Sequence, residues 1–486
     1  MTEKTIFELS SPGRVGVRFP ACDVPESPLP ESLLRKDLPL PELSEFDVVR
    51  HFTNISKLNY CIDQGFYPLG SCTMKYNPKI NESMARLSGF AFTHPMQPIE
   101  TVQGNLVLMY ELQELLREIS GFSAVTLQPA AGAQGELVGI MIIRAYHLAN
   151  KQTRRTKILI PDSAHGTNPA TSAMAGFSVV PIPSDAGGNI DLDALRAACT
   201  DEVAGLMFTN PNTLGLFDQH VLDVIRIVHE AGGLVYGDGA NMNALLGITR
   251  PGDLGIDVMH FNLHKTFSTP HGGGGPGSGP VAVSEQLKDF LPSPIVGIID
   301  PGDSETPPLY GLIDPPQTIG RFKAFYGHFG MLVRAYTYIL MHGPEGIRKI
   351  AENAVLNANY LKVLLDDIYH VPYNRICMHE FVAEGHFKDA PEIHALDIAK
   401  RLIDYGIHPP TNYFPLIVKE ALMIEPTETE SKQTVDAFAQ TMRTIAREAH
   451  ENPSLLHDAP TKAPYRRMDE VKAAKDLILV DKTLIR

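Results

Sequence analysis

The sequence has no tryptophan, few cysteines, no long apolar run and no excess of positive charge. Its five cysteines are scattered and form no CxxC pair: Cys22, Cys61, Cys72, Cys199 and Cys377. An odd number of separated cysteines speaks against a disulfide framework, and also against a structural zinc site, which needs closely spaced ligands. We therefore expect a protein of a reduced compartment, the cytoplasm, with no metal site.

The apolar stretches are too short or too polar to cross a membrane. The most apolar helical pattern covers residues 325–341 and contains His328 and Arg334, so it predicts a buried core helix. The first residues, MTEKTIFELSSPGR, lack a basic segment followed by an apolar core and do not predict a signal peptide. We expect no membrane partner.

Acidic residues outnumber basic ones by 56 to 42, which gives a formal net charge of −14 at pH 7 with histidine neutral. A protein that binds duplex nucleic acid needs a basic face to displace counterions, and this composition does not require one. We therefore expect no nucleic-acid partner. With 44% hydrophobic and 20% charged residues, the composition is that of a globular protein.

The chain of 486 residues divides by pattern into three segments. Residues 1–100 are rich in proline, glycine, serine and asparagine with little periodicity, which predicts an irregular N-terminal arm that serves an interface or a site. Residues 101–325 alternate short apolar runs with helical patterns and predict a large domain. Residues 326–486 predict a smaller C-terminal α/β domain.

The apolar runs of the large domain predict seven strands, at residues 124–127, 157–160, 177–182, 203–209, 233–236, 256–261 and 280–283. Helical spacing predicts helices at residues 100–120, 135–149, 169–175, 192–198 and 219–231, the fourth with Asp191 as its N-cap. After a proline- and glycine-rich stretch at residues 291–317, helices are predicted at 325–341, 346–368, 395–405 and 432–450. This alternation predicts an α/β fold with a mainly parallel sheet, whose ligands bind beyond the carboxyl ends of the strands.

Four polar motifs follow predicted strands in chain order. They are the turn at residues 129–136, His165 within residues 162–169, Asp238 after the fifth strand, and Lys265 after the sixth, followed by a glycine-rich loop at 272–279. Each motif alone has an ordinary interpretation: a common strand–helix turn, a loop histidine, a capping aspartate and a solvated lysine. Together they meet the needs of pyridoxal phosphate, which requires an anion cradle, a stacking group, a carboxylate against its pyridine nitrogen and a lysine.

Four sequence strings resemble the glycine dehydrogenase (decarboxylating) family, the P-protein of the glycine cleavage system. The strings are YPLGSCTMKYNP at residues 67–78, GAQGE at 132–136, AHGTNPA at 164–170 and NLHKTF at 262–267. The similarity extends over nearly all of the chain. It is to the cofactor-bearing half of the P-protein, which some organisms make separately as subunit 2.

The resemblance implies a fold-type I pyridoxal-phosphate-dependent transferase fold, and an oxidoreductase that acts on a CH–NH2 group with a disulfide as acceptor. In the implied reaction, glycine displaces Lys265 from its covalent aldimine with the cofactor and loses carbon dioxide. The aminomethyl group then passes to the lipoyl arm of H-protein. The implied partners are subunit 1, in a heterotetramer with two copies of each subunit, and lipoylated H-protein.

The resemblance also assigns roles to individual residues. Lys265 is the Schiff-base lysine, Asp238 pairs with the ring nitrogen, and His165 stacks on the ring and is a candidate proton carrier. The remaining implied cofactor contacts are Gly132, Ala133 and Gln134 near the phosphate, His264 close by, and Asn210 at the phenolic oxygen. Ala130 and Ala131 offer no hydroxyl groups, so backbone N–H groups and other side chains must bind the phosphate. Lys75, in the loop at residues 70–78, either shapes the substrate or lipoyl entrance or has a structural role.

Two rival functions remain open. The first is another fold-type I pyridoxal-phosphate enzyme, such as an amino-acid decarboxylase or a cysteine desulfurase. A desulfurase needs a nucleophilic cysteine on a mobile loop, and the one late candidate, Cys377, lies in a stretch (residues 374–379) that we predict as a strand. The second rival is a non-catalytic partner subunit, against which the presence of Lys265 speaks.

Overall fold

The structure is a computed structural model that describes residues 4–36, 38–271 and 277–479. Its contacts divide the chain into two compact units. One unit comprises residues 65–457, and the other comprises residues 1–64 together with residues 458–486. Because this division does not separate residues 65–457 any further, the three segments with boundaries at residues 100 and 325 stay a prediction.

A seven-stranded sheet is the centre of the larger unit. Its strands are β1 (Ala124–Thr126), β2 (Lys157–Pro161), β3 (Ser178–Ile182), β4 (Val203–Thr209), β5 (Leu234–Gly239), β6 (Val258–Phe261) and β7 (Val281–Val283). The order across the sheet is β1-β7-β6-β5-β4-β2-β3, with β2 to β6 parallel and β7 antiparallel to both of its neighbours. All seven predicted strands and the mainly parallel sheet are therefore confirmed.

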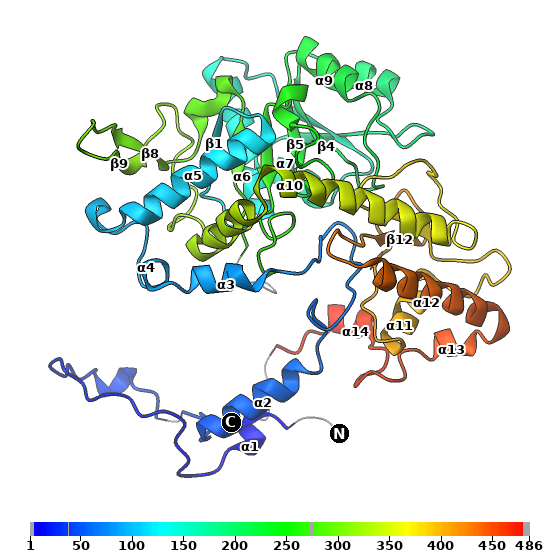
Figure 1. The fold of residues 1–486 in the computed structure, drawn as a ribbon, viewed down its shortest axis with the longest axis horizontal. Coiled ribbons are helices and arrows are strands. Elements are labelled where there is room, and N and C mark those ends of the chain that lie inside the picture. Colours follow the sequence, from blue (N-terminus) through cyan, green and yellow to red (C-terminus); the bar gives the residue numbers. More distant parts are fainter. Residues whose placement is uncertain (1–3, 37, 272–276, 480–486) are drawn as a thin grey trace. The chain divides into compact units, whose positions relative to one another are not determined.

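Helices cover both faces of this sheet. One face packs against α6 (Gly132–Ala149) and α7 (Thr167–Met174), and the other against α5 (Gln103–Ser120), α8 (Leu192–Ala198) and α9 (Val221–Glu230). In Figure 1, α5 lies close to the long helix α10 (Phe329–Leu365), which contacts it. Asp191 caps α8, because its Oδ1 accepts hydrogen bonds from the N–H groups of Asp193 and Ala194, each at 2.9 Å. Coverage of both faces explains why central strands such as β4 are almost continuously apolar.

The C-terminal part of the larger unit has its own core and a smaller sheet. Strands β10 (Phe381–Glu384), β12 (Ala421–Ile424) and β11 (Thr411–Asn412) form an antiparallel sheet, packed with α11 (Ala395–Asp404), α12 (Lys432–Glu451) and α13 (Ser454–His457). Helix α10 combines two predicted helices, because Gly343 (φ 62°) and Pro344 interrupt its regular path. The prediction of a strand at residues 374–379 is wrong, since the strand begins only at Phe381.

Several elements lie where no regular structure was expected. The proline- and glycine-rich stretch contains a hairpin, β8 (Ile295–Asp300) and β9 (Leu309–Ile313). The segment predicted to be irregular contains α3 (Lys79–Ala85), α4 (Ser88–Ala91) and, in the smaller unit, α2 (Glu45–Ser56). Ser44 and Asp47 form a capping box at the start of α2, and this spacing is a local sequence signal for a helix.

The smaller unit has few regular elements. Besides α2 it contains α1 (Ile6–Leu9) and α14 (Glu470–Lys475), and most of its described side chains are exposed. Among the described residues of the whole chain, no helix is long and apolar enough to span a membrane.

Candidate active site

The carboxyl ends of β4 and β5 and the turn after β6 meet at a pocket. Its lining consists of Ser71, His165, Thr209, Pro211, Asn212, Thr213, Asp238, Ala240, Asn241, Lys265, His379 and Glu380. The structure thus brings together His165, Asp238 and Lys265, three residues that lie in separate sequence motifs. Parallel strands explain this convergence, because their carboxyl ends lie at one edge of the sheet.

Asp238 is the charged group at the centre of this edge. It is the penultimate residue of β5, and its side chain is 3% exposed. Asn168 Nδ2 donates a hydrogen bond to Oδ2 at 3.2 Å, and His260 Nε2 lies 3.8 Å from Oδ1. Burial raises the pKa of Asp238, whereas His260, His165 and Lys265 lower it. The lowering is the larger effect, so the net pKa is below the ordinary value. Asp238 is therefore a carboxylate that can pair with a protonated ring nitrogen.

Glu136, the fifth residue of α6, is a second carboxyl group close to Asp238. It accepts hydrogen bonds from Thr167 Oγ1 at 3.0 Å and from Asn168 Nδ2 at 3.1 Å. Burial, followed by the charge of Asp238, raises the pKa of Glu136 to about 7. The negative charge of this region is thus held mainly on Asp238. The GAQGE string contains Glu136, but its spacing did not indicate this role.

His165 lies between a serine and an aromatic ring. Its Nε2 is 2.6 Å from Ser71 Oγ, and its ring is stacked on Phe414 with the centroids 4.8 Å apart and the planes at 20°. Burial lowers the pKa of His165, so the ring is neutral near pH 7. A flat, neutral imidazole held in this way is suited to stacking on an aromatic cofactor.

Lys265 lies in the turn that follows β6, where its backbone N–H donates to the carbonyl of Asn262 at 2.9 Å. Within the described part of the chain, its ammonium group has no hydrogen-bond or ion-pair partner. The buried Oγ1 of Thr209, in the same pocket, also lacks a partner among the described residues. Buried polar groups without partners are costly, so this lining fits a polar ligand that would satisfy them.

The predicted phosphate turn begins α6 and packs against the turn that carries Lys265. A side chain at Gly132 would collide with the amide group of Asn262, so any other residue here would displace the Asn262 side chain. Gln134 Oε1 accepts a hydrogen bond from the Ala130 N–H at 2.8 Å and closes the turn. The first N–H groups of a helix have no partners within that helix, and α6 therefore offers an anion site to the side of the pocket.

The other predicted residues near the phosphate lie around this turn. His264 is close to His271, with ring centroids 5.1 Å apart, and burial lowers its pKa to about 3. Neither His264 nor Gly132, Ala133 and Gln134 belongs to the lining of the pocket itself. Residues 272–276 of the predicted glycine-rich loop lie outside the described residues.

Asn210 points to a neighbouring turn. Its Oδ1 accepts a hydrogen bond from the Asp218 N–H at 3.0 Å, and the flanking residues Thr209 and Pro211 line the pocket instead. Its contact with the cofactor therefore stays a prediction. The hydroxyl group of Thr209 is the strand-end polar group that the motif did not single out.

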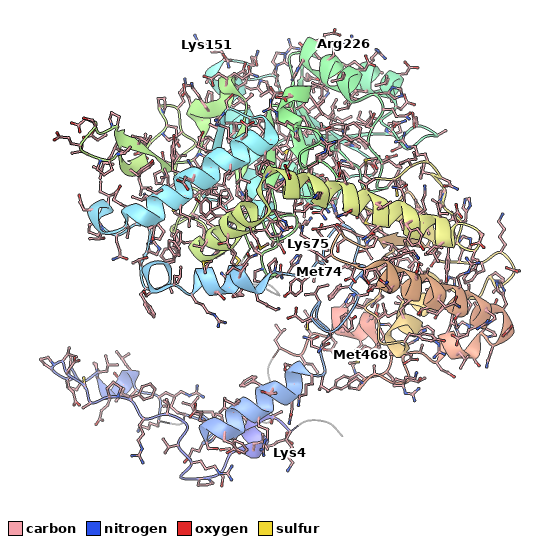
Figure 2. The ribbon with its side chains drawn as sticks, in the orientation of Figure 1. Lys4, Met74, Lys75, Lys151, Arg226 and Met468 are labelled. Carbon is pink, nitrogen blue, oxygen red and sulfur yellow. The ribbon has the colours of Figure 1, made fainter. Side chains whose placement is uncertain are left out.

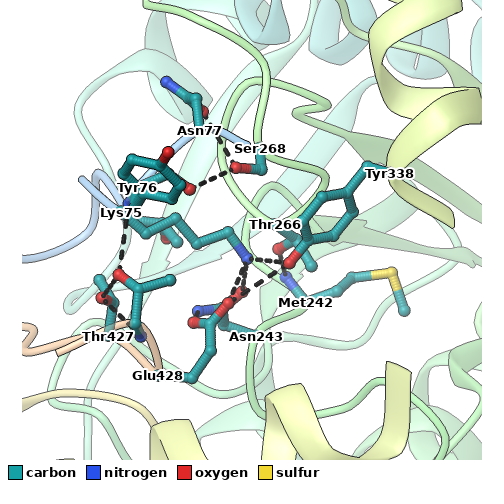
Figure 3. Close-up of polar contacts among 12 residues, drawn as sticks. Lys75, Tyr76, Asn77, Met242, Asn243, Thr266, Ser268, Tyr338, Thr427 and Glu428 are labelled. Atoms are coloured by element: carbon teal, nitrogen blue, oxygen red, sulfur yellow. Dashed lines mark hydrogen bonds and ion pairs between the residues drawn. The ribbon is translucent and has the colours of Figure 1, made fainter. Parts of the chain in front are cut away.

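Lys75 lies within the larger unit beside α10, whereas Lys151 and Arg226 lie on the surface (Figure 2). Its ammonium group donates to Glu428 Oε1 at 2.7 Å, to Tyr338 Oη at 3.1 Å and to Asn243 Oδ1 at 3.2 Å (Figure 3). Burial lowers the pKa of Lys75, but Glu428 and Tyr338 together raise it by more, and the net pKa is above the ordinary value. Of the two roles left open for Lys75, these contacts favour the structural one.

The loop that precedes Lys75 reaches the pocket in a strained conformation. Ser71 (φ 68°) and Thr73 (φ 51°) both have left-handed backbones, which cost about 1–3 kcal/mol each for non-glycine residues. The N–H of Ser71 donates to Glu380 Oε2 at 2.6 Å, and Thr73 donates to Glu425 from its N–H at 3.0 Å and its hydroxyl group at 2.7 Å. No local sequence pattern indicates these contacts, although the loop is part of the YPLGSCTMKYNP string.

Cys377 does not have the properties of a nucleophile. It is 1% exposed and is not part of the pocket lining, and burial raises the pKa of its thiol to about 12. A thiol with this pKa is protonated at neutral pH, and a thiolate is the reactive form. The structure therefore gives no support to the cysteine desulfurase alternative.

Comparison with known families matches two parts of the chain. The family described as aminotransferase class-V matches residues 140–295, and the family described as glycine dehydrogenase, C-terminal domain, matches residues 350–461. The first match covers most of the seven-stranded sheet, and the second covers most of the smaller sheet and its helices.

Curated relatives are similar over nearly the whole length of the chain. A probable glycine dehydrogenase (decarboxylating) subunit 2 of Caldanaerobacter subterraneus is 58% identical over 480 residues, which are 98% of each chain. A protein of the same description from Thermotoga maritima is 55% identical over 474 residues, covering 97% of this chain and 98% of the relative.

Solved structures share the fold at much lower identity. A glycine decarboxylase (P-protein) of the glycine cleavage system, in inhibitor-bound form, has a TM-score of 0.73 at 20% identity and covers 86% of this chain and 93% of its own. A cysteine desulfurase from Thermococcus onnurineus has a TM-score of 0.59 at 16% identity and covers 79% of this chain and 97% of its own. These structures confirm the predicted fold-type I architecture.

Proposed function

This chain belongs to the family of glycine dehydrogenase (decarboxylating) subunit 2, and from that premise we propose that it decarboxylates glycine and transfers the aminomethyl group to the lipoyl arm of H-protein. The observation that carries the proposal is the pocket at the sheet edge. There an ionised Asp238, a neutral His165 and Lys265, whose ammonium group has no partner among the described residues, line one pocket. This is the set of groups that a pyridoxal-phosphate site requires.

The residues of the chain fit this cofactor. Lys265 would bind it covalently through its ε-amino group, and Asp238 would hold a proton on the pyridine nitrogen. His165 would pack on the ring and fix its plane. When bound, pyridoxal phosphate supplies an electron sink for the electron pair that remains after glycine loses carbon dioxide.

The phosphate group would bind at the start of α6. Backbone N–H groups at Gly132, Ala133 and Gln134 support this placement, since Ala130 and Ala131 have no hydroxyl groups. His264 lies beside this turn, and we retain Asn210 as a contact to the phenolic oxygen. These assignments are consistent with the close packing of Gly132 on the turn of Lys265.

The name subunit 2 of the relatives indicates a partner subunit. We propose that the partner is subunit 1, in a heterotetramer with two copies of each chain, and that the assembly acts on lipoylated H-protein in the cytoplasm. Residues 1–100 would contribute much of the interface. The exposed apolar side chains of this segment, such as Val17 (64% exposed) and Phe19 (86%), support this assignment.

The direct test is isotope exchange. We expect the full-length protein, combined with subunit 1, pyridoxal phosphate and lipoylated H-protein, to exchange labelled bicarbonate into the carboxyl group of glycine. Without the lipoyl group, transfer of the aminomethyl group should not occur, because the group then has no acceptor. Absence of exchange in the complete mixture would overturn the proposed function.

A further inference from the structure

A buried pair of carboxyl groups borders the pocket. Glu380 directly precedes β10 and Glu425 directly follows β12, and the register of these antiparallel strands pairs Phe381 with Ile424. The two glutamates are therefore placed side by side, with exposures of 3% for Glu380 and 0% for Glu425. Glu380 lines the pocket together with Lys265, and Glu425 lies behind the loop that carries Thr73.

The hydrogen bonds of the pair come from donors that hold the carboxyl groups in place. Ser71 N–H donates to Glu380, while Thr73 and Asn241 donate to Glu425, the last at 3.1 Å. An oxygen of each carboxyl group and a ring nitrogen of His379 lie within 4.8 Å of one another. Two buried carboxylates this close cannot both carry a full charge without a compensating proton or cation.

His379 provides an independent indication that this cluster faces a ligand. Its side chain is 3% exposed, its Nε2 lies 3.7 Å from Glu380 Oε1, and both ring nitrogens lack hydrogen-bond partners among the described residues. Burial lowers the pKa of His379 to about 3, so the ring is neutral and does not neutralise the pair. An unpartnered neutral imidazole in the lining of a pocket is suited to a reacting or bound polar group.

The surroundings of Glu380 and Glu425 favour a state in which one of the two carboxyl groups keeps its proton. Burial raises the pKa of Glu425 to about 7, and burial followed by the charge of Glu425 raises the pKa of Glu380 well above its ordinary value. The titratable groups that face the pair or share its pocket are Lys265, Asp238, His165, His379 and Cys72. Lys265 lowers both pKa values, but less than burial raises them.

The proposed reaction needs a proton at one defined step. The aminomethyl carbon forms a C–S bond with one lipoyl sulfur, using the electron pair left by the departing carbon dioxide. The S–S bond breaks, and the second sulfur leaves with the bonding pair as a thiolate, so the disulfide is reduced while the aminomethyl carbon is oxidised. A proton must then reach that second sulfur. His165 is a poor source, because it is neutral and its Nε2 is engaged with Ser71.

We propose that Glu380 is the acid that protonates the departing lipoyl sulfur, and that Glu425 keeps Glu380 supplied with the shared proton. The proposal rests on the proposed function and assigns a catalytic acid to its transfer step. The proton moves from a Glu380 oxygen to the thiolate, and water restores it to the pair afterwards. Ser71 N–H holds Glu380 at the pocket, so the loop of residues 70–73 orients the acid.

The first test needs neither the cofactor nor turnover. Infrared spectra of the full-length protein at pH 7 should contain protonated-carboxyl absorption whose intensity falls in both Glu380→Gln and Glu425→Gln, while the remainder belongs to other buried carboxyl groups such as Glu136. The matched control is Glu384→Gln, at the other end of β10, and the intensity should not change in it. Absence of this absorption in the wild type, or an intensity that neither variant of the pair lowers, would overturn the proposal. So would a stoichiometric metal ion, found by elemental analysis, that is lost in either glutamine variant of the pair.

The second test separates the chemical steps in a single turnover with glycine, subunit 1 and lipoylated H-protein. In Glu380→Gln we expect normal cofactor absorbance and carbon dioxide release, with thiol formation slowed about 10²-fold or more, as for loss of a general acid. Thiol formation in the wild type should slow as the pH rises above 7. Glu380→Gln should lose this pH dependence, and Glu380→Asp should retain it.

The outcomes distinguish this inference from the proposed function. If the wild type releases carbon dioxide and Glu380→Gln forms thiol at the wild-type rate, the assignment of the acid is wrong and the proposed function stands. The same holds if His165→Asn abolishes the pH dependence and Glu380→Gln keeps it. If the wild type releases no carbon dioxide from glycine, the proposed function and the assignment of Glu380 as the acid are both wrong.

Discussion

The pocket has two sides of different origin. On the sheet side, His165 and Lys265 each follow a strand of the parallel sheet, and Asp238 is the penultimate residue of β5. On the opposing side, Ser71 and Glu380 meet from positions 309 residues apart, and Thr73 and Glu425 from positions 352 residues apart. The sheet side depends on local order along the chain, whereas the other side exists only once the C-terminal strands and the loop of residues 70–75 have come together. The difference suggests that the sheet side holds the cofactor and the other side adapts the site to its reaction.

On the sheet side, we expect the largest loss of activity from Asp238→Asn. The variant loses the buried charge that would hold a proton on the cofactor ring, and we expect glycine exchange to fall by about 10²-fold or more, as for loss of a preorganised electrostatic contact. Steady-state exchange rates measure the effect, with circular dichroism to verify the fold. Asp162→Asn, directly after β2 but outside the pocket lining, is the matched control and should retain activity.

The opposing side of the pocket can be destabilised by a substitution at Lys75. Lys75→Met leaves the Glu428 carboxylate buried without its cation, and loss of one partner of a buried pair costs about 3–5 kcal/mol of the free energy of unfolding. Urea denaturation of the full-length protein measures this change. The control Lys432→Met removes an exposed ion pair with Asp436 and should leave the denaturation midpoint unchanged. Equal midpoints for the two variants would contradict the structural role of Lys75.

The smallest effect is expected where the two sides touch. Ser71→Ala removes the hydrogen bond to His165 Nε2, and loss of about 1 kcal/mol corresponds to a roughly 5-fold lower exchange rate. The left-handed backbone at Ser71 is equally strained for alanine, so the hydroxyl group is the relevant change. Ser83→Ala, at an exposed position of α3, should have no effect. An exchange rate unchanged in Ser71→Ala would show that this contact does not orient His165 for catalysis.

Much of the fold follows from patterns within short windows. The seven strands could be predicted because β4 and its neighbours are buried on both faces and are nearly continuously apolar, and α8 because Asp191 caps it. The hairpin β8–β9 escaped prediction, since its strands lie within a stretch whose prolines and glycines are typical of loops.

The residues of the site also divide into those that short sequence patterns predict and those that they do not. Lys265, Asp238 and His165 could be identified because each lies at a strand end with a specific chemical requirement. Glu380 and Glu425 could not, because a glutamate beside a short strand is usually a solvated charge, and their burial results from the pairing of β10 with β12. For Asn210 the assignment stays a prediction, because its Oδ1 accepts a hydrogen bond from a neighbouring turn and no contact in the structure tests its role at the cofactor.

The most direct test of the central claim is the covalent attachment point of pyridoxal phosphate. The full-length protein is loaded with the cofactor, reduced with borohydride, digested and mapped by mass spectrometry. We predict one pyridoxyl modification, on the peptide that contains Lys265, and none in the Lys265→Ala variant. Modification of a different lysine, or the absence of any modification in the wild type, would contradict the assignment of this pocket as the active site.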